Sequence, residues 1–182
     1  MVLIGRARQL VWILAIAGAG CAHQLPPSDT SPITATQPTA LSPGKIGAFQ
    51  GQYRFLSNFW PATVEYEGII YPDVEHAYQS AKTLDMSERR KIAALSTPAE
   101  ANRAGEALPL RPDWLQIKYQ VMQQCVRFKF THHPELAEKL LATGDAYLEE
   151  GNYWGDRIWG VYQGEGTNWL GKILMRVRSE LQ

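Results

Sequence analysis

The spacing of apolar and polar residues predicts a hairpin followed by a helix near the middle of the chain. Residues 63–66 and 69–71 are short runs rich in β-branched and aromatic side chains, and Glu67-Gly68 between them suits a tight turn. Asp73 has the side chain of a helix N-cap, and we expect that helix to run to about residue 84. Its buried stripe should be formed by the apolar residues that recur at spacings of three and four, namely Val74, Ala77, Tyr78, Ala81 and Leu84.

Helical patterns fill most of the remaining sequence. Thr97-Pro98-Ala99-Glu100 is a capping box with proline at the first helical position, and the longest helix begins after Asp113. Helices are predicted from Ser87, over 97–107, from 113 to the break at His132-His133-Pro134, over 134–141 and over 168–181, with a short strand near 147–149. No βαβ alternation is visible, so the fold class is predicted to be α+β: a mostly helical single domain with a few short strands.

The first 44 residues differ from the rest, because they contain one aromatic residue and three charged ones. Arg6 and Arg8 precede an apolar run over 10–19, which is too short to span a bilayer and ends in small residues before Cys21. This segment resembles a bacterial lipoprotein signal in which Cys21 is acylated; a plain N-terminal anchor and a misassigned start codon are the alternatives. Residues 22–44 are rich in Pro, Ser and Thr and are predicted to form a disordered tether.

The organisation that follows is a signal peptide over 1–21, a tether over 22–44 and a folded domain over 45–182. We expect a lipoprotein anchored to a membrane through Cys21, in the periplasm or at the cell surface, or a cytoplasmic protein if the N-terminus is misassigned.

Charge and cysteine content exclude several classes of protein. Lysine and arginine number 18, as do aspartate and glutamate, so the formal net charge is zero and gives no strong nucleic-acid signal. The two cysteines cannot build a disulfide scaffold, and no spacing of Cys and His indicates a metal site. Cys125 belongs to the apolar stripe of the longest helix and is predicted to be a buried structural thiol.

Three stretches carry side chains beyond what core or surface requires. Residues 53–61 are dense in aromatics around Arg54 and Asn58, which suit phosphate or base contacts, although core packing is favoured for Phe55 and Phe59. Glu75 and Lys82 share one stripe of the helix after Asp73, where a solvated charged face is the alternative.

The third stretch contains two Trp-Gly pairs, at Trp154 and Trp159, followed by a glycine-rich turn over 164–168. A glycine turn that leads into a helix presents free backbone N–H groups suited to a phosphate, although such turns are also common as plain turn chemistry.

At these stretches the sequence resembles a known family, the NADAR (YbiA-like) N-glycosidases. The motifs are GxYRFLSNFWP from residue 51, YPxVEHAYQxxK from 71, TP, AxxxG and LRxDW between 97 and 114, NxWGDxxWGV from 152 and GxGxNxLGKILMxVR from 164. The resemblance covers about residues 49–178 in the right order. It implies hydrolysis of the bond between ribose phosphate and a base, as in ribosylamino-pyrimidine phosphates of the riboflavin pathway, or removal of ADP-ribose from a base, without metal or organic cofactor.

The resemblance also implies roles for individual residues. Glu75 would stabilise the sugar cation or activate water, Lys82 would bind phosphate or form a Schiff base with the opened sugar, and Asp156 would hold ribose hydroxyls or assist departure of the base. The residues expected to bind the small-molecule substrate are Arg54, Phe55, Asn58, Tyr78, Trp154, Trp159, Gly166 and Asn168. A catalytically silent module that binds a nucleotide or ADP-ribose, and a surface structural protein, are the competing hypotheses.

Overall fold

Short helices joined by brief strands make up the described part of the chain, which is residues 44–182 of a computed structural model. The predicted signal peptide, Cys21 and all but the last residue of the tether lie outside these residues and stay predictions. The elements are β1 (Lys45–Ile46), the 3-10 helix η1 (Gly51–Leu56), β2 (Val64–Tyr66), β3 (Ile69–Tyr71), α1 (Val74–Ser80), α2 (Met86–Ala93), α3 (Pro98–Glu106), α4 (Trp114–His132), α5 (Pro134–Leu141), β4 (Tyr147–Leu148), β5 (Gly151–Asn152), β6 (Val161–Tyr162) and α6 (Trp169–Glu180). The α+β class, mostly helical with a few short strands, is confirmed.

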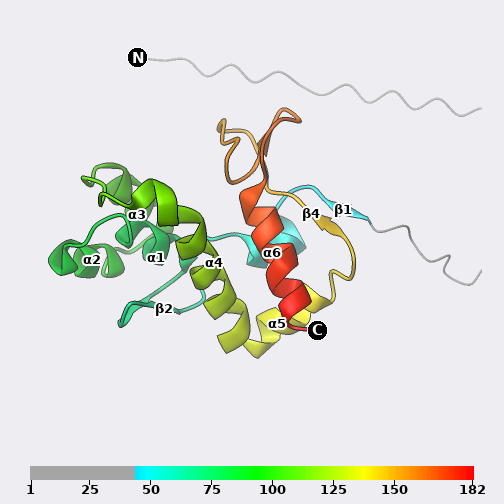
Figure 1. The fold of residues 1–182 in the computed structure, drawn as a ribbon. Helices are drawn as coiled ribbons and strands as arrows, with labels where there is room; N and C mark the ends of the chain where they lie inside the picture. Colours follow the sequence, from blue (N-terminus) through cyan, green and yellow to red (C-terminus); the bar gives the residue numbers. More distant parts are fainter. Residues whose placement is uncertain (1–43) are drawn as a thin grey trace, which may run out of the picture. The chain divides into compact units, whose positions relative to one another are not determined.

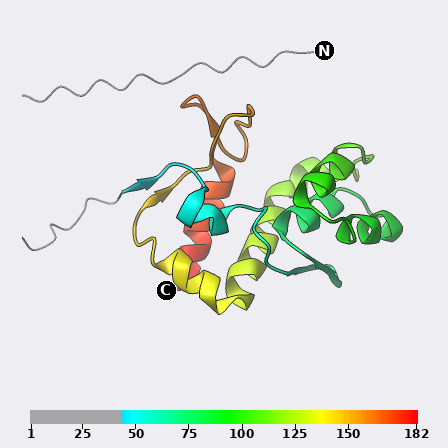
Figure 2. The same cartoon turned by 180° about the vertical axis from the view of Figure 1, so that it is seen from behind.

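The long helix α4 joins the two ends of the domain. Figures 1 and 2 show α1, α2 and α3 gathered at one of its ends, whereas α6 lies beside its other half and β4 and β1 lie beyond α6. The apolar face of α4 buries Trp114, Val121 and Cys125 against these neighbours. Burial raises the pKa of the Cys125 thiol to about 12, as expected for a structural thiol. No helix within residues 44–182 is both long enough and apolar enough to cross a membrane.

Several local predictions are confirmed. β2 and β3 pair as an antiparallel hairpin in which Glu65 lies opposite Ile70. The capping box of α3 is complete, because the Thr97 side chain accepts from the Glu100 backbone and the Glu100 carboxylate accepts from the Thr97 backbone.

The predicted end of α1 is wrong, because the helix stops at Ser80 and residue 84 is largely exposed. Two contacts beyond Ser80 explain the stop. The backbone carbonyl of Lys82 accepts from Arg111 N at 2.7 Å, and Asp85 caps the next helix by accepting from the N–H groups of Ser87 and Glu88. Lys82 therefore lies in a turn and not on the helix.

Two parallel pairings, β1 with β4 and β5 with β6, were not predicted. Each strand has two residues, too few for a period to be visible, and β1 lies about a hundred residues from its partner in the sequence.

Candidate functional site

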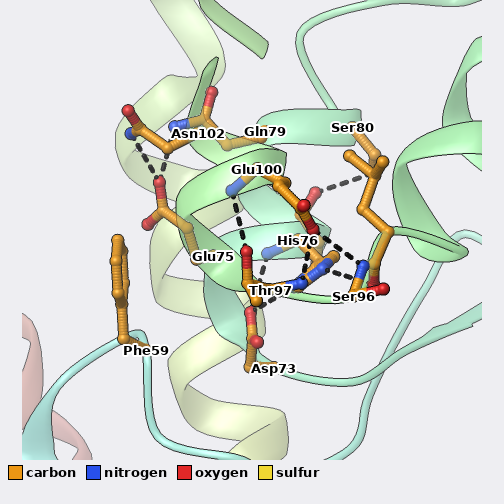
Figure 3. Close-up of polar contacts among 12 residues, drawn as sticks. Phe59, Asp73, Glu75, His76, Gln79, Ser80, Ser96, Thr97, Glu100 and Asn102 are labelled. Atoms are coloured by element: carbon orange, nitrogen blue, oxygen red, sulfur yellow. Dashed lines mark hydrogen bonds and ion pairs between the residues drawn. The ribbon is translucent and has the colours of Figure 1, made fainter. Parts of the chain in front are cut away.

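The start of α1 is fixed by a buried aspartate–histidine pair. Asp73 Oδ1 accepts from the His76 backbone N–H at 2.9 Å and lies 2.7 Å from His76 Nδ1. On its other side the ring nitrogen Nε2 of His76 lies 3.3 Å from the Leu95 carbonyl oxygen. This pair ties the helix to the connection between α2 and α3, and so sets the direction of the side chains that follow (Figure 3).

Glu75, in the first turn of α1, is 6% exposed and is held by two amides. Its Oε1 accepts from Gln79 Nε2 at 2.7 Å and from Asn102 Nδ2 at 2.9 Å (Figure 3). Burial raises the pKa of Glu75, whereas these two donors and the charge of Lys82 act in the opposite direction by favouring the anion. Oε2 receives no hydrogen bond from the described residues and is not fully buried. This oxygen is therefore open to a ligand.

Close packing between α1 and α3 sets the position of Gln79. A Cβ atom at Gly105 would lie 2.1 Å from Gln79 Oε1, so only glycine lets the two helices approach this far. Asn102 and Gly105 are three residues apart on α3 and lie against the same stretch of α1. Asn102 is a site residue that sequence reasoning missed; the AxxxG motif that contains it was the available signal.

Aromatic rings form a wall beside Glu75. The Tyr78 ring centre lies 5.1 Å from that of Trp114 and 5.3 Å from that of Trp159, and Tyr119 lies 5.5 Å from Trp159. Burial raises the pKa of Tyr78, and the charges of Glu75 and Asp156 raise it further. The structure thus brings the tryptophan loop together with the carboxylate of α1, on which any shared site depends.

Lys82 is partly buried at the edge of this region. Burial lowers the pKa of its ammonium group, while the carboxylates of Glu75 and Glu106 act to raise it. Its backbone is pinned to the entry of α4 by the hydrogen bond from Arg111 N. The Lys82 side chain therefore lies within electrostatic reach of Glu75, although Lys82 lies in the turn after α1 and not on the helix.

The loop between β5 and β6 is shaped by polar side chains that bind backbone. Asn152 Oδ1 accepts from the N–H groups of Gly155 and Asp156, both at 3.1 Å, and its Nδ2 donates to the carbonyls of Asp156 and Val161. Asp156 Oδ1 in turn accepts from Ile158 N at 2.8 Å and Trp159 N at 3.0 Å. One oxygen of Asp156 is therefore used to present Trp159, and its Oδ2 receives no hydrogen bond from residues 44–182.

Loop carbonyls accept from three backbone N–H groups at the start of α6, where the sequence suggested a phosphate site. The backbone N–H groups of residues 168, 169 and 170 donate to the carbonyls of residues 160, 158 and 159, so the loop itself occupies the helix N-terminus. Gly166 is needed for this closure, because a Cβ there would lie 2.2 Å from the Gly160 carbonyl oxygen. The glycine-rich turn anchors the loop.

Asn168 is an internal clamp. It is 1% exposed and adopts a left-handed conformation with φ 51°. Its Nδ2 donates to the Leu148 carbonyl at 2.9 Å and to Tyr147 Oη at 3.1 Å, and its Oδ1 accepts from Glu150 N at 3.1 Å. The side chain holds β4 against the start of α6.

Glu150 lines a hollow of about 250 Å³ next to the loop. Arg54 reaches it from η1 with its Nη1 3.3 Å from Ser57 Oγ, and Trp154 reaches it from the loop. Trp154 and Trp159 thus stand in different surroundings. The hollow is lined by Phe49, Gln50, Gly51, Arg54, Ser57, Glu150, Gly151, Tyr153 and Trp154.

Phe55 and Asn58, the other predicted site residues of the aromatic stretch over 53–61, point inward. Phe55 is buried edge-on against Phe130, with ring centres 6.4 Å apart. The Asn58 carbonyl accepts from Glu75 N at 3.3 Å, and its Nδ2 lies 3.4 Å from Met122 Sδ. The buried Lys129 donates to the Phe55 and Ser57 carbonyls at 2.7 and 2.9 Å, so a residue that sequence reasoning missed positions this segment.

No group of three or more His, Cys, Asp or Glu side chains within residues 44–182 is placed to hold a metal ion. The chemistry that the arrangement offers is that of a buried carboxylate, a nearby amine and an aromatic wall.

Comparisons with known proteins match this domain. The sequence model of the NADAR domain matches residues 47–182. The chain is 41% identical over 137 residues to N-glycosidase YbiA of Escherichia coli (strain K12), which covers 71% of this chain and 82% of that protein. It is 40% identical over 131 residues to riboflavin biosynthesis protein VVA0006 of Vibrio vulnificus (strain YJ016), matching 70% of this chain but only 35% of that protein. The NMR structure of the Escherichia coli protein YbiA has a TM-score of 0.70 at 36% identity, and the match covers 78% of this chain and 86% of that one.

Proposed function

Because the chain belongs to the NADAR family, whose relatives include named N-glycosidases, it is a hydrolase of N-glycosyl compounds, and we propose that it cleaves the bond between ribose phosphate and a base. One observation carries the proposal: a buried carboxylate with two amide donors on one oxygen and its other oxygen open, beside a wall of aromatic rings.

Departure of a base from ribose leaves positive charge on C1′ and the ring oxygen. An anion held close to that charge lowers the barrier most when it is already oriented and shielded from water. Gln79 and Asn102 hold Glu75 in this way before substrate arrives, because both donors lie within hydrogen-bond distance of Oε1. Oε2 of Glu75 then faces the sugar cation or takes the proton of the attacking water.

Lys82 has two candidate roles, as phosphate ligand or as an amine that attacks C1′ of the opened sugar. Its lowered pKa suits the amine, while its remaining charge suits the phosphate. Borohydride added during turnover separates them: it would reduce a Schiff base to a stable ribityl adduct on Lys82, visible by peptide mass spectrometry. An unmodified Lys82 together with a raised KM in Lys82→Met would identify the phosphate role.

Asp156 and the two loop tryptophans complete the proposed site. Asp156 Oδ2 is free of hydrogen bonds from the described residues and would accept from a ribose hydroxyl, while Oδ1 keeps the loop in place. Either Trp159, beside Tyr78, or Trp154, in the hollow, would stack on the flat ring of the base.

The substrate that we propose is a ribosylamino-pyrimidine phosphate, since one relative is named a riboflavin biosynthesis protein. An ADP-ribosyl base is the alternative. The full chain should be incubated with both classes, and release of free base and of ribose 5-phosphate or ADP-ribose followed by mass spectrometry. Release from only one class would identify the substrate, and tight binding without release from either would show a silent binding module.

For location we propose a lipid-anchored protein. Ribosylamino-pyrimidine phosphates are cytosolic, so this substrate and the lipid anchor are alternatives: an anchored enzyme would act on a related ribosyl compound outside the cytoplasm, and a misassigned N-terminus would keep the enzyme with the cytosolic substrate. Mass analysis of the mature N-terminus tests this: an acylated Cys21 would support the anchor, and an intact Met1 would contradict it.

A further inference from the structure

We infer that Glu150, which none of the sequence motifs singled out, is the acid that donates a proton to the departing base. The inference rests on the proposed function and adds to it a second carboxyl group with the opposite task from that of Glu75.

The position of Glu150 is set by its backbone. Its N–H donates to Asn168 Oδ1 at 3.1 Å, and its carbonyl accepts from Val161 N at 2.9 Å. Gly160 packs so closely that a Cβ there would lie 2.3 Å from the Glu150 carbonyl oxygen. Glu150 is therefore fixed at the junction of β4 and β5, at the base of the tryptophan loop.

The side chain of Glu150 has no partner of its own. Within residues 44–182 the carboxyl group of Glu150 makes no hydrogen bond or ion pair, and neither of its oxygens is fully buried. It therefore keeps access to the hollow that Arg54 and Trp154 also line. A carboxyl group in such a place is available to a ligand.

The charged groups around Glu150 favour its protonated form. Burial raises its pKa to about 8, and the carboxylates of Asp156 in the loop and Glu75 on α1 add to the shift. Arg54 on η1 is the basic group that lines the hollow with it. Burial raises the pKa of Glu75 as well, but its carboxylate accepts from two amides that favour the anion, whereas the carboxyl of Glu150 has no such donor. Two carboxyls whose environments differ in this way suit an acid and its partner.

The step balances with water as the only co-reactant. The C1′–N bond breaks and its electron pair goes to the base nitrogen, which takes the proton of Glu150. Water bonds to C1′ and gives one proton to Glu75, leaving a hydroxyl on C1′. The proton on Glu75 returns to Glu150 through solvent, so the products are the free base and ribose phosphate.

The test compares Glu150→Gln with Glu149→Gln in the full chain. Both remove one carboxyl group from neighbouring positions, but Glu149 forms an ion pair with the exposed Lys45 at 2.7 Å, away from the hollow. We expect Glu150→Gln to lower kcat about 100- to 1,000-fold on the ribosylamino-pyrimidine phosphate and to abolish the fall in kcat above about pH 8, while Glu149→Gln changes neither. A substrate whose base leaves as a neutral molecule without protonation, such as a ribosyl pyridinium, should lose little.

A stability measurement tests the same group without turnover. Native Glu150 holds its proton up to about pH 8, whereas the unfolded chain releases it near the ordinary glutamate pKa, so folding binds a proton in between and stability falls as pH rises through that window. The denaturant midpoint of Glu150→Gln minus that of the wild type should therefore increase from pH 5 to pH 8. A constant difference would show that Glu150 is ionised and overturn the inference.

The outcomes separate the two proposals. Normal turnover by Glu150→Gln, or an unchanged alkaline limb, would overturn the role of Glu150 and leave the proposed function standing. Absence of base release by the wild-type chain from every substrate would overturn the proposed function and the role of Glu150 with it.

Discussion

The site has a helical side, formed by α1 and α3, and a loop side, formed by residues 149–168. On the helical side, hydrogen bonds from other side chains fix the position of one side chain, whereas on the loop side hydrogen bonds from side chains fix the path of the backbone. Glu75 is bound by amides from α1 and α3, each donating to its carboxylate. Asn152, Asp156 and Asn168 instead bind the N–H and carbonyl groups of the loop and of β4. The helical side thus fixes one charge, and the loop side fixes a shape.

The difference predicts how each side fails. Exchanging one atom of Glu75 removes charge from a scaffold that stays in place, because α1 and α3 pack through other residues. Removing a clamp of the loop releases several backbone groups at once, and buried groups without partners are costly. Mutations on the helical side should therefore affect turnover first, and those on the loop side stability first.

The largest effect should come from Glu75→Gln. The change keeps the size of the side chain and removes its charge, so we expect kcat to fall about 1,000-fold, or about 4 kcal/mol in barrier, with little change in substrate affinity. Single-turnover kinetics and calorimetric binding measure the two separately. Glu138→Gln on the exposed face of α5 is the matched control and should keep full activity. Full turnover in Glu75→Gln would remove the carboxylate from the mechanism.

Next is the clamp of the loop side, Asn168. Asn168→Ala should lower the free energy of unfolding by about 2–3 kcal/mol, because the Leu148 carbonyl and the Glu150 N–H lose buried partners. Asn168→Gly should recover about 1 kcal/mol of this, since glycine removes the strain of φ 51° but restores neither bond. Equal destabilisation by both variants would show that backbone strain plays no part. Urea unfolding curves measure both.

Local sequence patterns accounted for elements whose signals lie within a few residues. The hairpin around Glu67-Gly68, the capping box of Thr97 and the break at Pro134 each depend on neighbouring side chains, and all three are present. The end of α1 was missed because it is decided by Arg111, which is 29 residues from Lys82. The spacing of apolar residues along a helix cannot show that a residue far away in the sequence will bind a backbone carbonyl that the helix would otherwise use.

The same rule separates what could be foreseen of the site. Glu75 and Gln79 lie one turn apart on one stripe, and their hydrogen bond follows from that spacing. Asn102 donates to the same oxygen from 27 residues away, and no spacing within α1 indicates it. At the turn over 164–168 the glycines were visible, but whether loop carbonyls already occupied the N–H groups of α6 depended on the path of the loop.

A smaller effect should come from Gly105→Ala, which tests how the helical side holds its charge. The added methyl group would lie 2.1 Å from Gln79 Oε1 and should push the amide away from Glu75, lowering kcat about tenfold. Gln79→Ala removes the amide itself, so Gly105→Ala should have little further effect in that background. Additive losses in the double variant would show that the methyl group acts elsewhere, for example on α3. A double-mutant cycle on kcat gives the answer.

The smallest effect should come from Trp154→Ala, which separates the shape of the loop from its contacts. The indole is 59% exposed and contacts Tyr153, which is 81% exposed, so its loss should change the free energy of unfolding by less than about 0.5 kcal/mol. If Glu150 protonates the base, the base lies in the hollow beside Trp154, and KM should rise about fivefold, or about 1 kcal/mol of lost stacking. Trp159→Ala is the matched control: its ring packs on Tyr78, so it should lose stability well beyond that limit. A KM that rises in Trp159→Ala but not in Trp154→Ala would show that the base binds against α1 and outside the hollow. That result would count against Glu150 as the proton donor to the base.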